Sequence, residues 1–306
     1  MLVAGSKILK AAQDGQYAVP AFNINNLEIL EGVMQAAVEL RSPVFISTSQ
    51  GAISYAGMEY LGAMVRVAAK ERVPIALHLD HGTDLSIVRA AINSGYYTSV
   101  MYDGSALSYA DNLAATKKVV QLAHAKGISV EAELGAIGGK EDHIDIRADQ
   151  ARLTDPDKAK DFVKRSKCDS LGVAIGTAHG AFKFLAKPKL DLKRLEQIRD
   201  RVSVPLVLHG ASAVPANYIA MANKYGGRIK GAKGNSDLEI RQAIIRGICK
   251  INIDTDLRVA FTAGIRRHLA KNSENIDPRG YLSEGKQYVY LIAKHKMKLF
   301  GSIGKA

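Results

Sequence analysis

The sequence predicts an α/β protein, a single (β/α)8 TIM barrel with one extra helix at the C-terminus. Two observations lead to this prediction. Short apolar segments alternate with helical patterns along all 306 residues. Residues suited to chemistry stand at the ends of many of these apolar segments. An open, doubly wound sheet would gather them at one switch point, so we favour the closed barrel.

The eight predicted strands are short apolar segments. Several are apolar at nearly every position, as expected for parallel strands that are covered on both faces. Proline precedes some of them, as at Pro74 and Pro205, where its missing N–H is tolerated. In chain order the predicted strands are Ala18–Ile24, Val44–Ser49, Ile75–Asp80, Ser99–Asp103, Ser129–Leu134, Ser170–Ile175, Leu206–His209 and Lys250–Asp254.

The segments between the strands have a helical period. Apolar residues recur about every 3.6 residues in Leu27–Leu40. Similar patterns predict helices at Asp84–Asn93, Asn112–Ala125, Asp157–Lys164, Leu192–Arg199 and Asp256–Leu269. The tail, Tyr281–Phe300, predicts an extra helix outside the barrel. Glycine-rich stretches that begin at Gly135, Ala178 and Gly226 predict long loops, which usually carry function on a barrel. No second domain is indicated, so residues 1–306 are expected to form one catalytic domain.

The composition narrows the class of function. A net charge of +12 favours anionic partners, but the basic residues are scattered and no nucleic-acid-binding motif is present. Binding of small phosphorylated substrates would explain part of this positive charge. A non-enzymatic nucleic-acid-binding protein remains as a remote alternative. No apolar segment approaches the roughly 20 residues of a membrane span, and no signal peptide is evident. Two widely separated cysteines, Cys168 and Cys249, fit buried thiols in the cytoplasm.

Three histidines share one sequence context. His81, His179 and His209 each lie at or just beyond the end of an apolar predicted strand, and each precedes a glycine. In a barrel, the C-terminal strand ends converge on the face that carries the active site. Three neutral imidazoles and one open position make a catalytic zinc site. We therefore predict a zinc centre on this face.

Acidic residues cluster at the same strand ends. Asp80 directly precedes the first of these histidines, so it cannot easily be a ligand beside it, but it can face the substrate. Asp103 ends the fourth predicted strand. Glu131 and Glu133 alternate on the fifth, so both point to one face. Glu141 lies in the first glycine-rich loop. Carboxylates beside a Lewis-acid metal suit proton transfers next to a carbonyl group.

Phosphate sites are expected after the seventh and eighth predicted strands, where barrels commonly bind phosphate. Gly210-Ala211-Ser212 and Asn252-Ile253-Asp254-Thr255 offer backbone N–H groups, small residues and hydroxyls near helix starts. Gly180, with Lys183 nearby, could add to such a site. Arg258 begins the last barrel helix and could reach a second phosphate through two N–H groups.

These residues resemble the class II (zinc-dependent) fructose-1,6-bisphosphate aldolase family, which includes the tagatose-bisphosphate aldolases. The resemblance covers nearly the whole chain, from Tyr17 to the last helix. Its most specific parts are Leu77-His78-Leu79-Asp80-His81-Gly82, Val130-Glu131-Ala132-Glu133-Leu134-Gly135, Ala174-Ile175-Gly176-Thr177-Ala178-His179-Gly180, Leu208-His209-Gly210-Ala211-Ser212 and Lys250-Ile251-Asn252-Ile253-Asp254-Thr255-Asp256.

The resemblance implies an activity and a set of metal ligands. The activity is the reversible cleavage of fructose 1,6-bisphosphate to dihydroxyacetone phosphate and glyceraldehyde 3-phosphate, a step of glycolysis and gluconeogenesis. By this resemblance His81, His179 and His209 hold the catalytic zinc. Asp103 and Glu133 match positions that hold the metal in an alternative or second site.

The resemblance also implies roles around the metal. Asp80 is the acid/base at the C4 hydroxyl. Glu141 moves the proton at C3 of the bisphosphate, the atom that becomes C1 of dihydroxyacetone phosphate. The residues implied to bind dihydroxyacetone phosphate are Gly180, Gly210–Ser212 and Asn252–Thr255, and those toward the aldehyde are Asn23, Ser49 and Arg258. Family members often bind Na⁺ or K⁺ near the phosphate, and they are usually homodimers or homotetramers.

Two rival aldolases remain. Tagatose 1,6-bisphosphate differs from the fructose compound only at C4, although the stretch Asp254–Arg258 resembles the fructose enzymes more. A Schiff-base aldolase needs a lysine at an inner strand end, and Lys250 stands at the wrong end of its strand.

The chain also departs from the family pattern: Ala106 stands where many members have histidine, and Lys140 stands where many have a polar or acidic residue.

Overall fold

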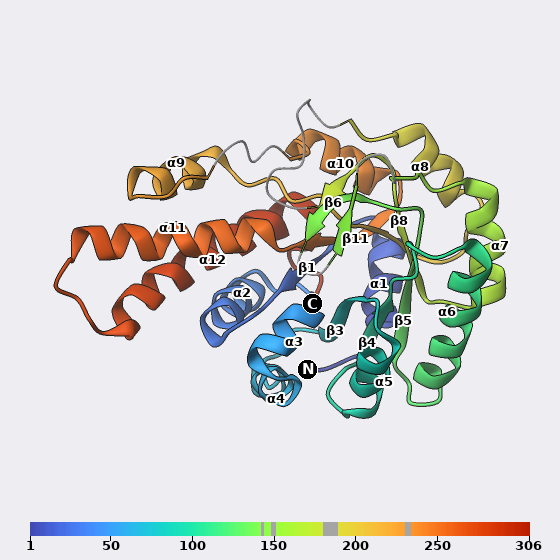
Figure 1. Ribbon diagram of the computed structural model, residues 1–306, viewed down its shortest axis with the longest axis horizontal. Helices are drawn as coiled ribbons and strands as arrows, with labels where there is room; N and C mark the ends of the chain where they lie inside the picture. Colours follow the sequence, from blue (N-terminus) through green and yellow to red (C-terminus); the bar gives the residue numbers. More distant parts are fainter. Residues whose placement is uncertain (142–143, 148–150, 180–188, 230–233) are drawn as a thin grey trace.

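The computed structural model describes residues 1–141, 144–147, 151–179, 189–229 and 234–306, with the main chain only at residues 140–141, 144–146 and 179. Eight strands, all parallel to their neighbours, close into a barrel in the order β1-β2-β3-β4-β5-β8-β10-β11 (Figure 1). They are β1 (Val19–Asn23), β2 (Val44–Ser49), β3 (Ile75–Gly82), β4 (Ser99–Tyr102), β5 (Ser129–Leu134), β8 (Ser170–Val173), β10 (Leu206–Leu208) and β11 (Ile248–Ile253). The predicted barrel and its eight strands are confirmed.

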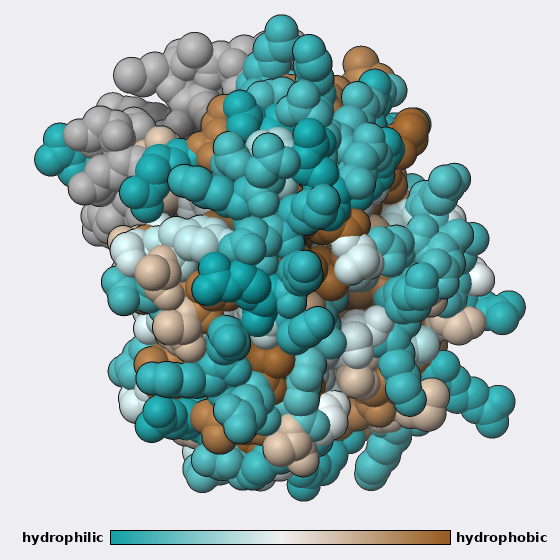
Figure 2. Space-filling view, turned by 90° about the vertical axis from the view of Figure 1, so that its right-hand side faces the viewer, coloured by the Kyte–Doolittle hydropathy of each residue, from teal (hydrophilic) through white to brown (hydrophobic). Residues whose placement is uncertain are grey.

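Helices cover the outside of the barrel. Most of them begin after a side chain that accepts a hydrogen bond from the first turn, such as Ser108 or Asp155. They are α2 (Leu27–Leu40), α3 (Gln50–Ala56), α4 (Met58–Ala68), α5 (Leu85–Asn93), α6 (Tyr109–His124), α7 (Pro156–Ser166), α8 (Leu192–Arg199), α9 (Ala216–Lys224), α10 (Asp237–Ile245), α11 (Thr255–Lys271) and α12 (Pro278–Phe300). On the side turned to the viewer in Figure 2 the surface is mainly hydrophilic, with small scattered apolar areas. No helix in the described segments has the length and apolar character needed to cross a bilayer.

A first helix that the sequence analysis did not predict, α1 (Gly5–Gly15), closes the bottom of the barrel. Its buried residues Ile8, Leu9 and Ala12 pack with inward-facing residues of the strands, among them Phe45 and Ala76. A side chain added at Gly5 would meet Phe45, Ser99 and Ser129 within 3 Å. Because α1 fills this end, the C-terminal strand ends remain as the face for chemistry.

The glycine-rich stretch after Gly135 was predicted as a loop, and this was wrong. It contains β6 (Gly138–Glu141) and β7 (Ile144–Ile146), which pair in antiparallel fashion, and β6 also pairs in parallel with β9 (Ala178–His179). Strands of two to four residues with glycines and charges have no apolar pattern for sequence analysis to detect. Because β6 follows the end of β5, this small sheet stands at the C-terminal face.

The C-terminal helix α12 begins three residues earlier than predicted and packs against α2, α11 and β1. In Figure 1, α11 and α12 run side by side and extend beyond the barrel. The contact with α2 is close because Gly32 faces α12: an added Cβ would lie 2.8 Å from the carbonyl oxygen of Lys286 and 2.9 Å from Val289. The helix is therefore part of the packed outer layer.

We expect Gly32→Ala to destabilise the protein by about 1–3 kcal/mol, because the new methyl group would push against a main-chain carbonyl that cannot rotate away. The thermal midpoint would show this loss. Gln35→Ala, on the exposed side of the same helix, is the control and should change the midpoint little. Equal midpoints for the two variants would contradict the close packing of α2 on α12.

Candidate active site

The end of β3 carries a β-bulge that brings two consecutive side chains to one place. The pairing with β4 runs from Leu79 and Val100 directly to Gly82 and Tyr102, so β3 has one residue more than its partner. Within the bulge, His81 has a left-handed backbone with φ of 46°, a conformation rare outside glycine. Donor atoms of Asp80, His81 and His209 consequently lie within 4.8 Å of one another.

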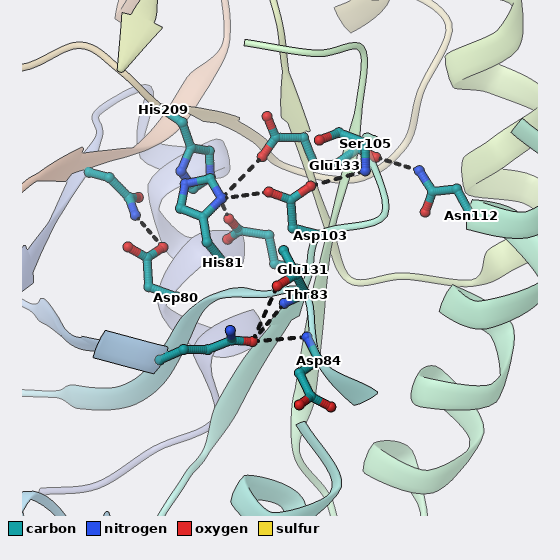
Figure 3. A network of polar contacts seen from close by, with 12 residues as sticks. Asp80, His81, Thr83, Asp84, Asp103, Ser105, Asn112, Glu131, Glu133 and His209 are labelled. Carbon is teal, nitrogen blue, oxygen red and sulfur yellow. Dashed lines mark hydrogen bonds and ion pairs between the residues drawn. The ribbon is translucent and has the colours of Figure 1, made fainter. Parts of the chain in front are cut away.

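Two carboxylates orient His81, as Figure 3 shows. Its Nδ1 lies 2.8 Å from Oδ2 of Asp103 and 3.8 Å from Oε2 of Glu133. Asp103 is itself fixed, because its Oδ1 accepts the main-chain N–H of Ser105 at 3.0 Å. With Nδ1 held by Asp103, the opposite side of the ring is the one that can bind a metal.

The charges in this cluster shift the pKa values of its members. Burial lowers the pKa of His81, but Asp80 and Asp103 outweigh burial and hold it at about 10. Burial and the neighbouring His81 lower the pKa of His209. Burial and the charge of Asp103 raise the pKa of Glu133 well above its usual range. A metal ion entering the site therefore competes with a proton on His81.

His209 has one bonded and one available ring nitrogen. Its Nε2 donates to Oε1 of Glu131 at 2.8 Å, which leaves Nδ1 as the unprotonated nitrogen of the neutral ring. This buried Nδ1 has no hydrogen-bond partner among the described residues. The two imidazole rings lie 4.4 Å apart, measured between the centroids of His81 and His209. A buried nitrogen lone pair beside a second histidine and a carboxylate fits a divalent metal ion.

A buried polar network lies below His209 in the barrel. Lys250 donates to Oε2 of Glu131 at 2.7 Å and to Nε2 of His78 at 3.2 Å. Because a lysine ammonium only donates, Nε2 of His78 accepts, and its Nδ1–H bonds Ser99 at 2.8 Å. Burial and the charge of Lys250 lower the pKa of His78 to about 3, so this ring stays neutral. These contacts give His78 a structural role within the barrel.

Two carboxamides hold Asp80. Nδ2 of Asn23 donates to its Oδ2 at 2.8 Å, and Nδ2 of Asn252 donates to its Oδ1 at 2.7 Å. Burial raises the pKa of Asp80, but His81 and His209 lower it by more, so the carboxylate form is favoured. The two asparagines come from β1 and β11, neighbours in the barrel, and hold the carboxylate from one side.

The other predicted binding residues surround this cluster. Ser49 is buried in register with Asp80 and caps α3 by accepting the N–H of Ala52 at 3.1 Å. Gly210, Ala211 and Ser212 follow β10, with a left-handed φ of 65° at Gly210 and with Ala211 and Ser212 buried.

The β11 end supplies the remaining predicted binding residues. Ile253 is fully buried, so only its main chain can reach a ligand. Thr255 opens α11. Asp254 holds Arg258 through both of its oxygens at 2.7 Å.

For four predicted site residues the structure does not describe the side chain. Gly180 and Lys183 lie outside the described residues, and so do the side chains of His179 and Glu141. The main chain beside His179 does pass close to the cluster, since an added Cβ at Gly210 would lie 2.7 Å from the carbonyl oxygen of Ala178.

Sequence analysis missed the roles of Glu131 and Lys250. A signal was present, because Glu131 shares its strand face with Glu133, and Lys250 shares its face with Asn252. Both residues are charged and lie within fully buried strands, which is rare unless they are paired. Their pairing across the barrel requires knowledge of strand order, which a single sequence does not give.

A (β/α)8 barrel with paired histidines and carboxylates at its C-terminal face defines a metal-dependent enzyme. A family model described as "Fructose-bisphosphate aldolase class-II" matches residues 3–305. The chain belongs to the class II fructose-bisphosphate aldolase family, and it is therefore a lyase that works with a divalent metal ion. The remote alternative of a non-enzymatic nucleic-acid-binding protein is set aside.

Similar proteins extend over the whole chain. The fructose-bisphosphate aldolase of Thermus caldophilus is 45% identical over 306 residues, which are all of this chain and all of that protein. The fructose-bisphosphate aldolase of Helicobacter pylori is 43% identical, again with both chains covered completely. Among solved structures, the YdjI aldolase of Escherichia coli K12 superposes with a TM-score of 0.81 at 36% identity, with both chains fully covered.

We expect Glu131→Gln to weaken metal binding about 10- to 100-fold, because the carboxylate that orients His209 and balances Lys250 is lost. Affinity can be measured by competition with a chromogenic chelator. Glu196→Gln, which removes the surface partner of Arg246, serves as the control and should leave affinity unchanged. Unaltered affinity in the Glu131 variant would show that this carboxylate does not orient a ligand.

Proposed function

We propose that this protein reversibly cleaves fructose 1,6-bisphosphate into dihydroxyacetone phosphate and glyceraldehyde 3-phosphate, with zinc as its metal. The observation that carries the proposal is the Asp80 carboxylate, held by hydrogen bonds from two asparagines and placed within 4.8 Å of donor atoms of His81 and His209. The full-length relatives named fructose-bisphosphate aldolase support the same substrate.

In this proposal His81, His179 and His209 hold the zinc ion, and Asp103 and Glu131 fix the two rings whose contacts are described. When bound, zinc supplies a Lewis acid for the substrate carbonyl at C2. Nitrogen donors from histidine in a closed pocket suit zinc better than magnesium or calcium, which prefer oxygen ligands. Asp103 and Glu133, which face His81 together, are the candidates for an alternative metal position.

Asp80 is the proposed base for the C4 hydroxyl. It accepts this proton as the C3–C4 bond breaks and returns it in the condensation direction. Asn23 and Asn252 keep the carboxylate oriented. Their own side-chain oxygens are buried and have no partners among the described residues, so they are available to substrate hydroxyls. We assign the second proton transfer, at C3, to Glu141 on the basis of the family resemblance alone.

The two phosphates are proposed to bind on opposite sides of this centre. Gly210–Ser212 and Asn252–Thr255 follow neighbouring strands, and Gly180 and Lys183 complete the proposed site for the dihydroxyacetone phosphate end. Arg258, oriented by Asp254, lines a cavity of about 470 Å³ between α2, α3 and α11, close to Ser49. This cavity is our candidate for the aldehyde end.

Several further properties complete the proposal. We expect sodium or potassium near the phosphate, a homodimer or homotetramer, and action in the cytoplasm with Cys168 and Cys249 reduced, because both are buried free thiols. We propose fructose 1,6-bisphosphate as the substrate in preference to tagatose 1,6-bisphosphate. The two compounds differ only in configuration at C4, which carries the hydroxyl that Asp80 is proposed to deprotonate.

The first test compares cleavage of fructose 1,6-bisphosphate and tagatose 1,6-bisphosphate by zinc-loaded protein, with and without a chelator. We expect a strong preference for fructose, lost in chelator and restored by zinc, because only one C4 configuration presents its hydroxyl to Asp80. A preference for tagatose would keep the chemistry and change the substrate. No cleavage of either compound would refute the proposal.

The role of Asp80 can be tested with Asp80→Asn. We expect kcat to fall by about 10²- to 10⁴-fold, since the carboxamide cannot take a proton. Metal content, measured by elemental analysis, should stay close to that of the parent protein. Asp84→Asn is a matched control, because asparagine caps α5 as well as Asp84 does. Retention of kcat in the Asp80 variant would assign the base elsewhere.

A further inference from the structure

We propose that Lys296, on the outer helix α12, is a positioning residue that fixes both walls of the proposed phosphate site. This inference rests on the proposed function for the location of that site. The Nζ atom of Lys296 lies 2.9 Å from Oδ1 of Asp256, and only 3% and 0% of the two side chains are exposed. Asp256 directly follows Thr255, the first residue of α11. The ion pair therefore ties α12 to the α11 end of the site.

The same ammonium group also reaches the other wall. Nζ of Lys296 donates to the carbonyl oxygen of Ala213 at 3.4 Å, a long contact, and Ala213 directly follows Ser212. One cation thus contacts the loop after β10 and the first turn of α11. Because β10 and β11 are neighbouring strands, these two segments leave the barrel side by side.

The loop after β10 is enclosed from a second side by Gly234. A Cβ added at Gly234 would lie 2.1 Å from the carbonyl oxygen of Ser212 and 2.5 Å from Cα of Ala213. Main chain therefore packs directly on main chain there. With Gly234 on one side and Lys296 on another, the Ser212–Ala213 segment has little freedom to move.

The energetics favour a positioning role over a purely stabilising one. A buried ion pair is often no more stabilising than an apolar pair of the same size, whereas an unpaired buried charge is costly. Neither oxygen of the Asp256 carboxylate has a hydrogen-bond partner among the described residues, so the ion pair with Lys296 is the contact that offsets its charge. What the pair provides is a fixed distance between two segments, which an apolar contact would specify less well.

Phosphate binding is sensitive to such distances. Main-chain N–H groups and hydroxyls bind an anion well only when they converge on it. If Lys296 is lost, the β10 loop and the start of α11 are free to separate. We therefore expect weaker phosphate binding. The metal centre should stay intact, because Lys296 has no contact with it among the described residues.

The test compares Lys296→Met with Lys298→Met, an exposed lysine two residues further along the same helix. For Lys296→Met we expect KM for fructose 1,6-bisphosphate and the inhibition constant of inorganic phosphate to rise at least about tenfold, since misplacement by about 1 Å can cost more than that. We expect kcat to change less and zinc content to stay constant. Lys298→Met should match the parent protein.

The double variant Lys296→Met with Asp256→Asn separates positioning from stability. It removes the lone buried charge, so the thermal midpoint should recover relative to Lys296→Met. If Lys296 acts by bridging the two walls, KM and phosphate inhibition stay impaired in the double variant. If both recover together with stability, the ion pair is only structural and the proposal is overturned.

Two further measurements keep the proposal testable. Calorimetric titration with inorganic phosphate does not depend on cleavage, so it can reject the role of Lys296 even if the substrate is not fructose 1,6-bisphosphate. If Lys296→Met does not fold, Gly234→Ala changes the same loop from its other side. A tenfold weaker phosphate affinity in that variant supports the proposal, and unchanged affinity contradicts it.

Discussion

The carboxylate of Glu131 is the group on which the centre of the barrel depends. One of its oxygens accepts from His209 and the other from Lys250, and all three side chains are almost completely inaccessible to solvent. Burying charges is tolerable only when each is paired and hydrogen-bonded. Removing Glu131 would leave Lys250 without its counter-charge and His209 without a fixed tautomer. Stability of the barrel and placement of a proposed metal ligand thus share one interaction.

Strand periodicity explains why a supporting network lies beneath the chemical one. On β3, β5 and β11, residues two apart face the interior. The lower members of these pairs, His78, Glu131 and Lys250, form the buried network. The upper members, Asp80, Glu133 and Asn252, belong to the site. The bulge in β3 then adds His81 to the upper group at the cost of a left-handed backbone, the kind of strain that functional sites retain.

Sequence analysis predicted the barrel well because parallel strands buried on both faces are apolar throughout. It also selected Asp80, His81 and His209, whose donor atoms lie within 4.8 Å of one another, because active residues of barrels follow strand ends. It missed the helices α1, α3, α4, α9 and α10. It also missed the β6–β7–β9 sheet, whose short strands have no apolar pattern. It did not find the partners of Lys250, because position along one strand says nothing of a partner on another. The Glu131–Lys250 pair exists only after the sheet has closed, and no local pattern encodes that closure.

Buried lysines offset carboxylates both inside the barrel and under the outer helices. Four carboxylates, Asp80, Asp103, Glu131 and Glu133, gather where a substrate with two anionic phosphate groups is proposed to bind. Without compensation they would repel it. Lys250 offsets Glu131, and the raised pKa of Glu133 favours its neutral form. Farther out, Lys296 offsets Asp256 beside the proposed phosphate site. In both places a buried lysine cancels a charge and sets a distance. By our proposal, the packing of α12, predicted from the sequence as an extra helix outside the barrel, is thereby part of how the site is held.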